Sequence, residues 1–405
     1  MPKQALEGLK ILDFGWVVAG PQTGLYFAHY GATVVRIESI HRVDVARTSM
    51  PYKDNNPGIN RCGPFDFFNS GKLGMALNLS SPKGIAIARK LVVWADIVGE
   101  NFAPGVMHKL GLDYPELKKI KPDIIMYSSS NLGQTGPEAA QPGVGMQLVA
   151  YTGFSMLTGW PDRTSAVPHG AYTDFPSPRL IVASVLAAVE YRRRTGKGQH
   201  LDMSQMESGI HFLAPAVMDY FVNKRVQTRN GNRCEEAAPH GAFPCQGDDR
   251  WVAIAVFNDA EWLALREAMG APAWAMEARF ATLEGRKQNE DELEERLGEW
   301  TKRFRAEEIM EKLQAAGVSA GVVKNSEDVQ NDIQLAHRGY FQQLEHPEIG
   351  PLHYDGAGGC VLSKTPEKIA RPSPILGQHT EYVCREILGM GDDEFVDLLE
   401  QGVFE

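Results

Sequence analysis

Hydrophobic positions along the first two hundred residues follow two alternating patterns. Short runs rich in β-branched residues predict strands at 9–14, 33–38, 97–101 and 123–128. The stretches between these runs have helix-like spacing of their apolar residues. Strands that alternate with helices are typical of βαβ units stacked around a parallel sheet. The pattern therefore predicts an α/β fold for this part of the chain.

Two helices in this region carry recognisable end signals. Ser81 followed by Pro82 predicts an N-cap and a first helical residue, so we expect a helix with an apolar face that runs to about Trp94. A second helix is expected over 179–194, because the glycine-containing segment 195–198 would stop it there.

The pattern changes after about residue 225. A hairpin is predicted over 242–256 around the turn Gly247-Asp248-Asp249, and charged amphipathic helices are predicted over 259–314. This mixture indicates a smaller α+β domain inserted into the chain. We therefore expect a large domain with a parallel sheet and a small domain, formed by 1–225 with 330–405 and by 226–329, respectively.

Composition and charge narrow the classes of function. The 405 residues are 43% apolar and carry a net charge of −10, with an isoelectric point near 5.6. This balance argues against a nucleic-acid partner, because phosphate binding needs concentrated Lys and Arg. No run approaches the roughly 20 apolar residues that span a bilayer, and the first residues lack the order of a signal peptide. We expect a cytoplasmic protein with no membrane partner.

Several familiar catalytic and metal-binding motifs are absent from the sequence. The first predicted strand is followed by Gly15-Trp16-Val17-Val18-Ala19-Gly20-Pro21, which does not fit the G-x-G-x-x-G dinucleotide fingerprint. No segment fits the phosphate-binding P-loop or the G-x-S-x-G nucleophile elbow. The five cysteines and eleven histidines are dispersed without ligand spacing, so we expect no metal site.

Sequence motifs spread over nearly the whole chain resemble the class III CoA-transferase family, which also contains α-methylacyl-CoA racemases. The resemblance begins at 6–14 and 19–21 and continues in family order to the C-terminal part, through the segments 31–38, 44–47, 69–72, 77–79, 100–105, 195–199 and 374–380. It implies a Rossmann-like large domain. It also implies that coenzyme A enters as a substrate, as acyl-CoA, and that no cofactor is tightly bound.

The resemblance implies that Asp174 is the catalytic nucleophile. Asp174 lies in the segment 170–178, directly before the helix predicted over 179–194. From local sequence alone, an Asp at such a place would be an N-cap or a turn residue. The family's covalent route would give an aspartyl anhydride and then an aspartyl-CoA thioester. Each step passes through an oxyanion, so backbone donors near Gly20 should matter.

The resemblance also suggests which residues contact CoA. Ala19-Gly20-Pro21 would allow an anion or a thioester oxygen to approach a helix N-terminus, although the same residues also suit a tight strand-to-helix turn. Lys72 and Lys109 could meet CoA phosphates as point charges, whereas an isolated surface lysine is usually only solvated. The full expected set is Trp16, Val17, Val18, Ala19, Ser39, Lys72, Asn101 and Lys109.

One position favours transfer over racemisation. The family's racemases add a histidine upstream of the aspartate, because moving a proton at the α-carbon needs a second acid or base. The position aligned with that histidine is Val144, and His169 lies too close to Asp174 in sequence to be an obvious substitute. A racemase or epimerase, and a non-catalytic CoA-binding subunit, remain the alternatives to a transferase.

The acceptor and the assembly are expected from the resemblance as well. Trp16, Val18 and Tyr172 would make an apolar acyl pocket, which favours a bulky acid such as a benzylsuccinate-like dicarboxylate, with succinyl-CoA as donor. Family members form interlocked, ring-like dimers. We expect a homodimer, or a heterodimer with a related subunit.

Overall fold

The computed structural model describes residues 4–168, 170–356 and 359–405. The chain divides into two compact units: one comprises Met1–Ser155, Val167–Val226 and Ala336–Glu405, and the other comprises Met156–Ala166 and Gln227–Leu335. The sequence placed 156–166 in the large domain. In the structure, this segment belongs to the smaller unit. Arg229 of that unit donates hydrogen bonds to the carbonyls of Trp160 and Arg163.

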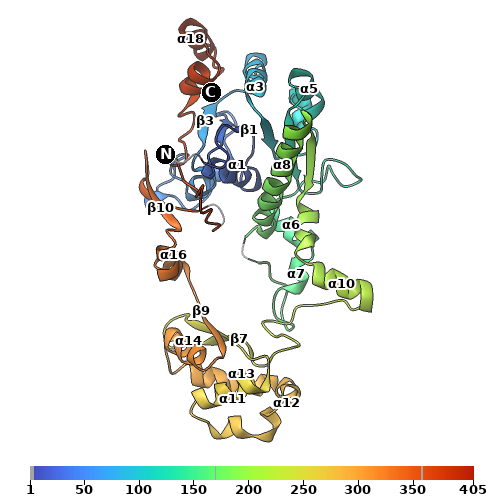
Figure 1. Ribbon diagram of the computed structural model, residues 1–405, viewed down its shortest axis with the longest axis vertical. Helices are drawn as coiled ribbons and strands as arrows, with labels where there is room; N and C mark the ends of the chain where they lie inside the picture. The colour runs from blue at the N-terminus through green and yellow to red at the C-terminus, as the bar shows by residue number, and fades with distance from the viewer. Residues whose placement is uncertain (1–3, 169, 357–358) are drawn as a thin grey trace. The chain divides into compact units, whose positions relative to one another are not determined.

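A six-stranded parallel sheet forms the centre of the larger unit (Figure 1). Its strand order is β3-β2-β1-β4-β5-β6, the doubly wound Rossmann order. The predicted α/β class is confirmed. The strands are β1 (Lys10–Asp13), β2 (Thr33–Glu38), β3 (Leu73–Ala76), β4 (Ile97–Glu100), β5 (Ile125–Ser130) and β6 (His200–Ser204).

All four strands predicted from the hydrophobic runs are present, and two further strands were missed. The missed strand β3 has only four residues and contains Gly74, which lowers its strand propensity. The other, β6, reads HLDMS, and its polar positions interrupt the apolar pattern. Both strands are the outermost of the sheet, and pairing with β2 and β5 stabilises them.

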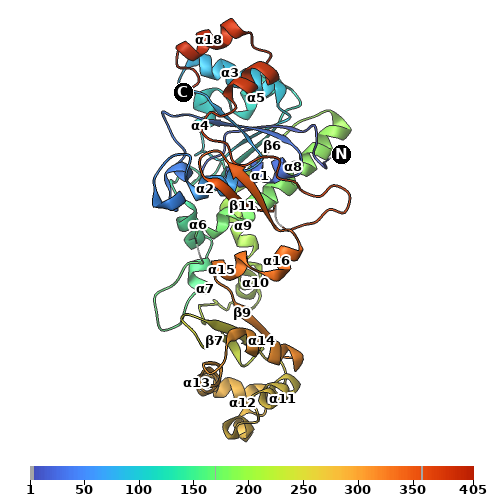
Figure 2. The ribbon, with the colours of Figure 1, turned by 90° about the vertical axis from the view of Figure 1, so that its left-hand side faces the viewer.

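Helices cover both faces of this sheet (Figure 1 and Figure 2). The helices of this unit include α1 (Ala19–His29), α2 (Gly63–Asn69), α3 (Pro82–Trp94), α4 (Val106–Leu110), α5 (Tyr114–Ile120), α6 (Gly145–Tyr151), α8 (Pro176–Thr195), α9 (Gln205–His211), α10 (Ala214–Asn223), α17 (Thr380–Tyr382) and α18 (Asp392–Glu400). The helix α7 (Phe154–Leu157) contains the residue at which the chain passes from one unit to the other.

Neighbouring residues of one strand point to opposite faces of the sheet. Leu12 therefore joins the core under α3, α5 and α18, whereas Ile11 joins the core under α1 and α8.

The predicted helix ends are confirmed. The Ser81 hydroxyl accepts from the Lys83 N–H at the start of α3, with Pro82 as the first helical residue. Gly196 ends α8 in the left-handed conformation with φ of 71°. Near the C-terminus, α17 is a single α-turn and is followed by a π-helical segment, Val383–Ile387. A hairpin of β10 (Phe341–His346) and β11 (Gly350–Asp355) precedes it.

The smaller unit has a three-stranded antiparallel sheet with the order β7-β8-β9. The predicted hairpin corresponds to β7 (His240–Pro244) and β8 (Trp251–Ala255), and the strand β9 (Ser319–Val323) was missed. The helices of the charged region pack on one face of this sheet around Trp262: α11 (Asp259–Ala268), α12 (Leu283–Gln288), α13 (Glu290–Thr301) and α14 (Ala306–Ala315). The chain returns through α15 (Ser326–Gln330) and α16 (Ile333–His337).

None of the helices in the described part of the chain is both long and apolar enough to cross a membrane.

Candidate active site

Side chains from the interior hold the loop between β1 and α1. The Gly15 N–H donates to Asp13 Oδ1 at 2.7 Å. The side-chain amide of Asn101 accepts from the Trp16 N–H at 2.7 Å and donates to the Trp16 carbonyl at 2.9 Å. Asn101, which was expected to contact CoA, therefore has its amide committed to the loop. The loop in turn presents Trp16 from a fixed backbone.

The first turn of α1 follows this loop directly, as the strand, turn and helix pattern predicted. A Cβ atom on Gly20 would lie 2.7 Å from both Asn101 Oδ1 and Gly15 Cα, so the close packing of the turn requires glycine here. No side chain caps the helix at Val18. Ala19 and Gly20, the buried first residues, therefore begin a helix whose leading N–H groups are uncapped by a side chain.

A cavity of about 260 Å³ lies at the carboxyl ends of β1 to β4. From β1 the chain adds β2 and β3 toward one edge of the sheet, and from β4 it adds β5 and β6 toward the other edge. Open α/β sheets bind ligands at the point between β1 and β4 where the strand order reverses. Trp16 and Phe102 form an apolar wall, with ring centroids 5.9 Å apart. The Arg42 guanidinium lies 5.2 Å from the centre of the Trp16 ring, and Ser39 and His41 also line the cavity.

The remaining expected CoA contacts are placed differently. Val17 is 40% exposed in the loop and Val18 is half-buried. Lys109 is exposed near the end of α4, next to Leu110, which lines the cavity. The structure thus brings Trp16 and Ser39 to one cavity, with Lys109 close along the chain.

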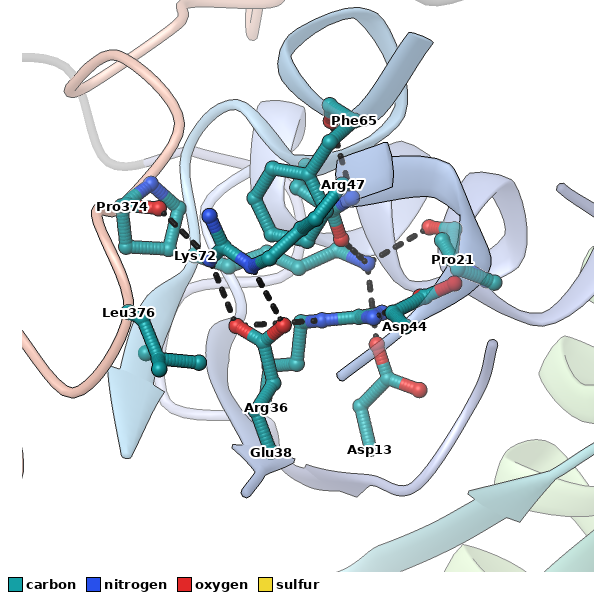
Figure 3. A network of polar contacts seen from close by, with 12 residues as sticks. Asp13, Pro21, Arg36, Glu38, Asp44, Arg47, Phe65, Lys72, Pro374 and Leu376 are labelled. Carbon is teal, nitrogen blue, oxygen red and sulfur yellow. Dashed lines mark hydrogen bonds and ion pairs between the residues drawn. The ribbon is translucent and has the colours of Figure 1, made fainter. Parts of the chain in front are cut away.

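Lys72 lies in the protein interior, contrary to the expected contact with a CoA phosphate. Its side chain has no exposed surface, and Nζ donates to Asp13 Oδ2 at 2.9 Å, to the Pro21 carbonyl at 2.7 Å and to Asn69 Oδ1 at 3.0 Å (Figure 3). Burial lowers the pKa of Lys72 to about 8, and the Asp13 carboxylate opposes this shift. The lysine supports the β1–α1 turn from inside, where a phosphate in solvent does not reach it.

Asp174 ends a short 3₁₀ turn, Tyr172–Asp174, directly before α8. The N-cap of α8 is Phe175, and no side chain makes a capping hydrogen bond there. Of the two interpretations from local sequence, the helix cap is therefore wrong and the turn residue is confirmed. The turn is fastened by the Ser177 hydroxyl, which donates to the Thr173 carbonyl at 2.7 Å.

The Asp174 carboxylate packs against the first residue of α6. A Cβ atom on Gly145 would lie 2.3 Å from Ala171 Cβ, 2.7 Å from Asp174 Oδ2 and 2.9 Å from Asp174 Oδ1. Only glycine therefore leaves room for the turn at Ala171 and for the carboxylate. Val144, the position aligned with the racemase histidine, is the residue just before this glycine and is 66% exposed. His169 lies outside the described residues. Gly145 was missed from the sequence because nothing local marks it.

Burial raises the pKa of the Asp174 carboxyl to about 7. Desolvation is the cause, and no hydrogen bond or charge from the described residues offsets it. Aromatic rings flank the turn: Tyr172 meets Phe154 edge to face at 5.0 Å, and Phe175 lies 6.1 Å from Phe68. A desolvated carboxylate with a raised pKa is a candidate nucleophile.

Among the described residues, no three His, Cys, Asp or Glu side chains converge as a metal site would require.

A family model described as CoA-transferase family III matches residues 6–380. The chain belongs to this family. A probable CoA-transferase from Mycobacterium tuberculosis is 32% identical, and the alignment covers 98% of this chain and 50% of that longer relative. A succinate–glutarate CoA-transferase from Agrobacterium fabrum is 30% identical over 95% of this chain and 96% of its own length.

A solved structure agrees with the fold of this family III CoA-transferase. A CAIB/BAIF family protein from Brucella suis aligns with a TM-score of 0.87 and 30% identity, covering 95% of this chain and all of that one. The family resemblance stated from the sequence motifs is confirmed. The predicted strand, turn and helix around Trp16 are present, but the sequence did not reveal that Arg42 and Phe102 line the same cavity as Trp16.

Proposed function

We propose that this enzyme transfers CoA from an acyl-CoA donor, with succinyl-CoA favoured, to a carboxylic acid, and that Asp174 is the nucleophile. The observation that carries this proposal is the desolvated Asp174 carboxylate packed against Gly145. A carboxylate deprived of water is a stronger nucleophile than a hydrated one. An acyl anhydride and a thioester are both activated acyl species, so the transfer needs no ATP.

The proposed route consists of successive nucleophilic attacks, each of which forms one bond to a carbonyl carbon and breaks another. An Asp174 oxygen attacks the thioester carbon, the carbon–sulfur bond breaks, and CoA thiolate leaves behind a mixed aspartyl anhydride. The thiolate then attacks the aspartyl carbonyl, which releases the donor acid as carboxylate and leaves an aspartyl-CoA thioester. The acceptor carboxylate attacks the carbonyl carbon of this thioester, the carbon–sulfur bond breaks, and CoA thiolate leaves behind a second mixed anhydride. Thiolate attack on the acceptor carbonyl gives the new acyl-CoA and regenerates Asp174.

The cavity at the switch point supports CoA binding at the sheet end. Trp16 and Phe102 offer apolar surface for an adenine ring, and Arg42 and His41 line the same cavity as possible phosphate partners. Exposed Lys109 supplies further positive charge nearby in the chain. We propose that these residues, with the loop containing Val17 and Val18, contact the nucleotide part of CoA.

The acceptor we favour is a dicarboxylic acid. The succinate–glutarate transferase relative supports this class, and the aromatic pair of Tyr172 and Phe154 beside Asp174 favours an acid with apolar bulk, such as benzylsuccinate. A racemase would need a second acid or base near Asp174, and Val144 cannot provide one. A non-catalytic CoA-binding subunit would have no use for a desolvated Asp174.

We also propose that the enzyme is a cytoplasmic dimer, interlocked as in its family. The helix α10 supports an assembly because it exposes a row of large apolar side chains: Val217, Met218, Tyr220, Phe221 and Val222. Light scattering of the purified chain distinguishes a homodimer from a subunit that needs a related partner, which would remain monomeric alone.

Mass spectrometry of the reaction products tests the proposed chemistry. Purified protein is incubated with succinyl-CoA and a panel that includes glutarate, benzylsuccinate and monocarboxylic acids, and new acyl-CoA species are measured. Hydroxylamine trapping should mark Asp174 in the wild type and leave the Asp174→Asn variant unmarked. Absence of transfer to any acid, together with α-proton exchange in deuterium oxide, would support the racemase instead.

A further inference from the structure

Val17 has a backbone conformation that its residue type disfavours. Its φ is 63°, in the left-handed region, where the branched Cβ of valine meets the backbone. Its side chain is 40% exposed, so burial does not compensate for this conformation. Strain of this kind persists only where the surroundings impose it, and it is concentrated at functional sites.

The Asp44 carboxylate accepts from the backbone of Val17. The Val17 N–H lies 3.1 Å from each oxygen of the Asp44 carboxylate. The same carboxylate accepts from the Ala46 N–H at 2.9 Å and pairs with the Arg36 guanidinium (Figure 3). Asp44 is 2% exposed and Arg36 is fully buried. Two donors, the Ala46 N–H and the Arg36 guanidinium, therefore fix the buried carboxylate in a position where it accepts from the Val17 N–H.

Arg36 contacts the loop on the other side of Trp16. Its Nη1 donates to the Gly15 carbonyl at 2.6 Å, while its Nη2 binds Asp44. The pair thus contacts the loop before and after the residue that forms the cavity wall. An asparagine cannot replace Asp44, because a carboxylate offers two acceptor oxygens and an amide offers one oxygen and a donating NH₂ group.

We propose that Asp44 is a positioning residue for CoA: it holds Val17 in the left-handed conformation and so fixes Trp16 in the cavity wall. The inference rests on the proposed function, which places CoA at this cavity. Without the carboxylate, Val17 relaxes to a conformation it prefers, and this change moves the Trp16 ring out of the wall even though Asn101 also bonds the Trp16 backbone. CoA then binds only the fraction of molecules whose loop is in place, and the apparent Kd rises as that fraction falls.

A substitution at Val17 provides the rescue test. Glycine adopts the left-handed conformation readily, so a loop with Gly at this position keeps its shape without the Asp44 carboxylate. In isothermal titration with CoA alone, the Kd of Asp44→Asn should be about tenfold higher than that of wild type. The Kd of Val17→Gly should stay within about twofold of wild type. The double variant should recover to within about threefold of wild type.

A second buried aspartate controls for the loss of a buried carboxylate as such. Asp66 is 4% exposed and accepts from the Ser373 hydroxyl at 2.5 Å. In the described part of the chain its side chain contacts Ser373 and His346, which lie outside the loop. Asp66→Asn likewise removes a buried carboxylate, and it should leave the Kd for CoA unchanged. The proposal is overturned if Asp44→Asn binds CoA as tightly as wild type, or if the double variant binds no better than Asp44→Asn.

A measurement without ligand separates this inference from the proposed function. The fluorescence of Trp16 is obtained by subtracting the spectrum of a Trp16→Phe variant made in the same background. Its emission maximum should shift to longer wavelength in Asp44→Asn. The maximum should return to the wild-type wavelength when Val17→Gly is added. If wild type fails to bind CoA, the proposed function is wrong, yet this comparison still decides the positioning role. Unchanged Trp16 emission in Asp44→Asn would then overturn it.

Discussion

Replacing Asp174 by asparagine should make the protein more stable at alkaline pH. The structure desolvates this carboxyl and raises its pKa from the ordinary 3.8 to about 7. Below pH 4 the carboxyl is neutral in both the folded and the unfolded chain. As the pH rises from 4 to 7, the unfolded chain loses the proton and the folded chain keeps it, so the folded state loses stability. Above pH 7 the loss is complete.

The magnitude follows from the size of the shift. About three pKa units at roughly 1.36 kcal/mol each set an upper limit of about 4 kcal/mol. Asp174 is half-buried, so residual solvation reduces this figure, and we expect the variant to gain about 2 kcal/mol over wild type at pH 8. The gain should shrink as the pH falls toward 4, because asparagine has no proton to release.

Urea unfolding at pH 5.5, 6.5 and 8 measures this difference. The exposed Asp248, changed to Asn in parallel, serves as the control and should show no comparable dependence on pH. A difference between Asp174→Asn and wild type that is absent, or that stays constant from pH 5.5 to 8, would refute the reasoning. It would mean that solvent reaches the carboxylate and that burial does not activate it.

Four further outcomes test the site. Asp174→Asn should lower kcat about a thousandfold or more in the mass-spectrometric assay, since no anhydride forms; substantial turnover would exclude the covalent route. Gly145→Ala should lower kcat at least about tenfold in the same assay, because the added Cβ meets both Ala171 and the Asp174 carboxylate and shifts the turn that carries the nucleophile; full activity would contradict the packing. Lys72→Met should cost about 3–5 kcal/mol in urea unfolding by leaving Asp13 buried and unpaired, whereas a surface lysine would cost almost nothing. Trp16→Ala should weaken CoA binding about tenfold in calorimetry if the ring covers adenine; an unchanged Kd would place CoA elsewhere.

The sequence by itself determined features that depend on local pattern. Runs of β-branched residues identified four strands of the central sheet, and Ser81 with Pro82 located the start of α3. Each of these signals acts within a few residues, so neighbouring side chains and backbone are enough to specify them. The order of motifs along the chain likewise identified the family before any contact was known.

Only the tertiary structure decided which groups meet. Lys72 looks like a solvent-exposed lysine in the sequence, but it is buried because Asp13, 59 residues away, provides a carboxylate inside the core. Asp174 looks like a helix cap, but its environment is set by Gly145 from another helix. The conformation of Val17 depends on Asp44, 27 residues further along the chain. Such pairings arise from the packing of distant segments, and residue type and spacing within one segment carry no record of them.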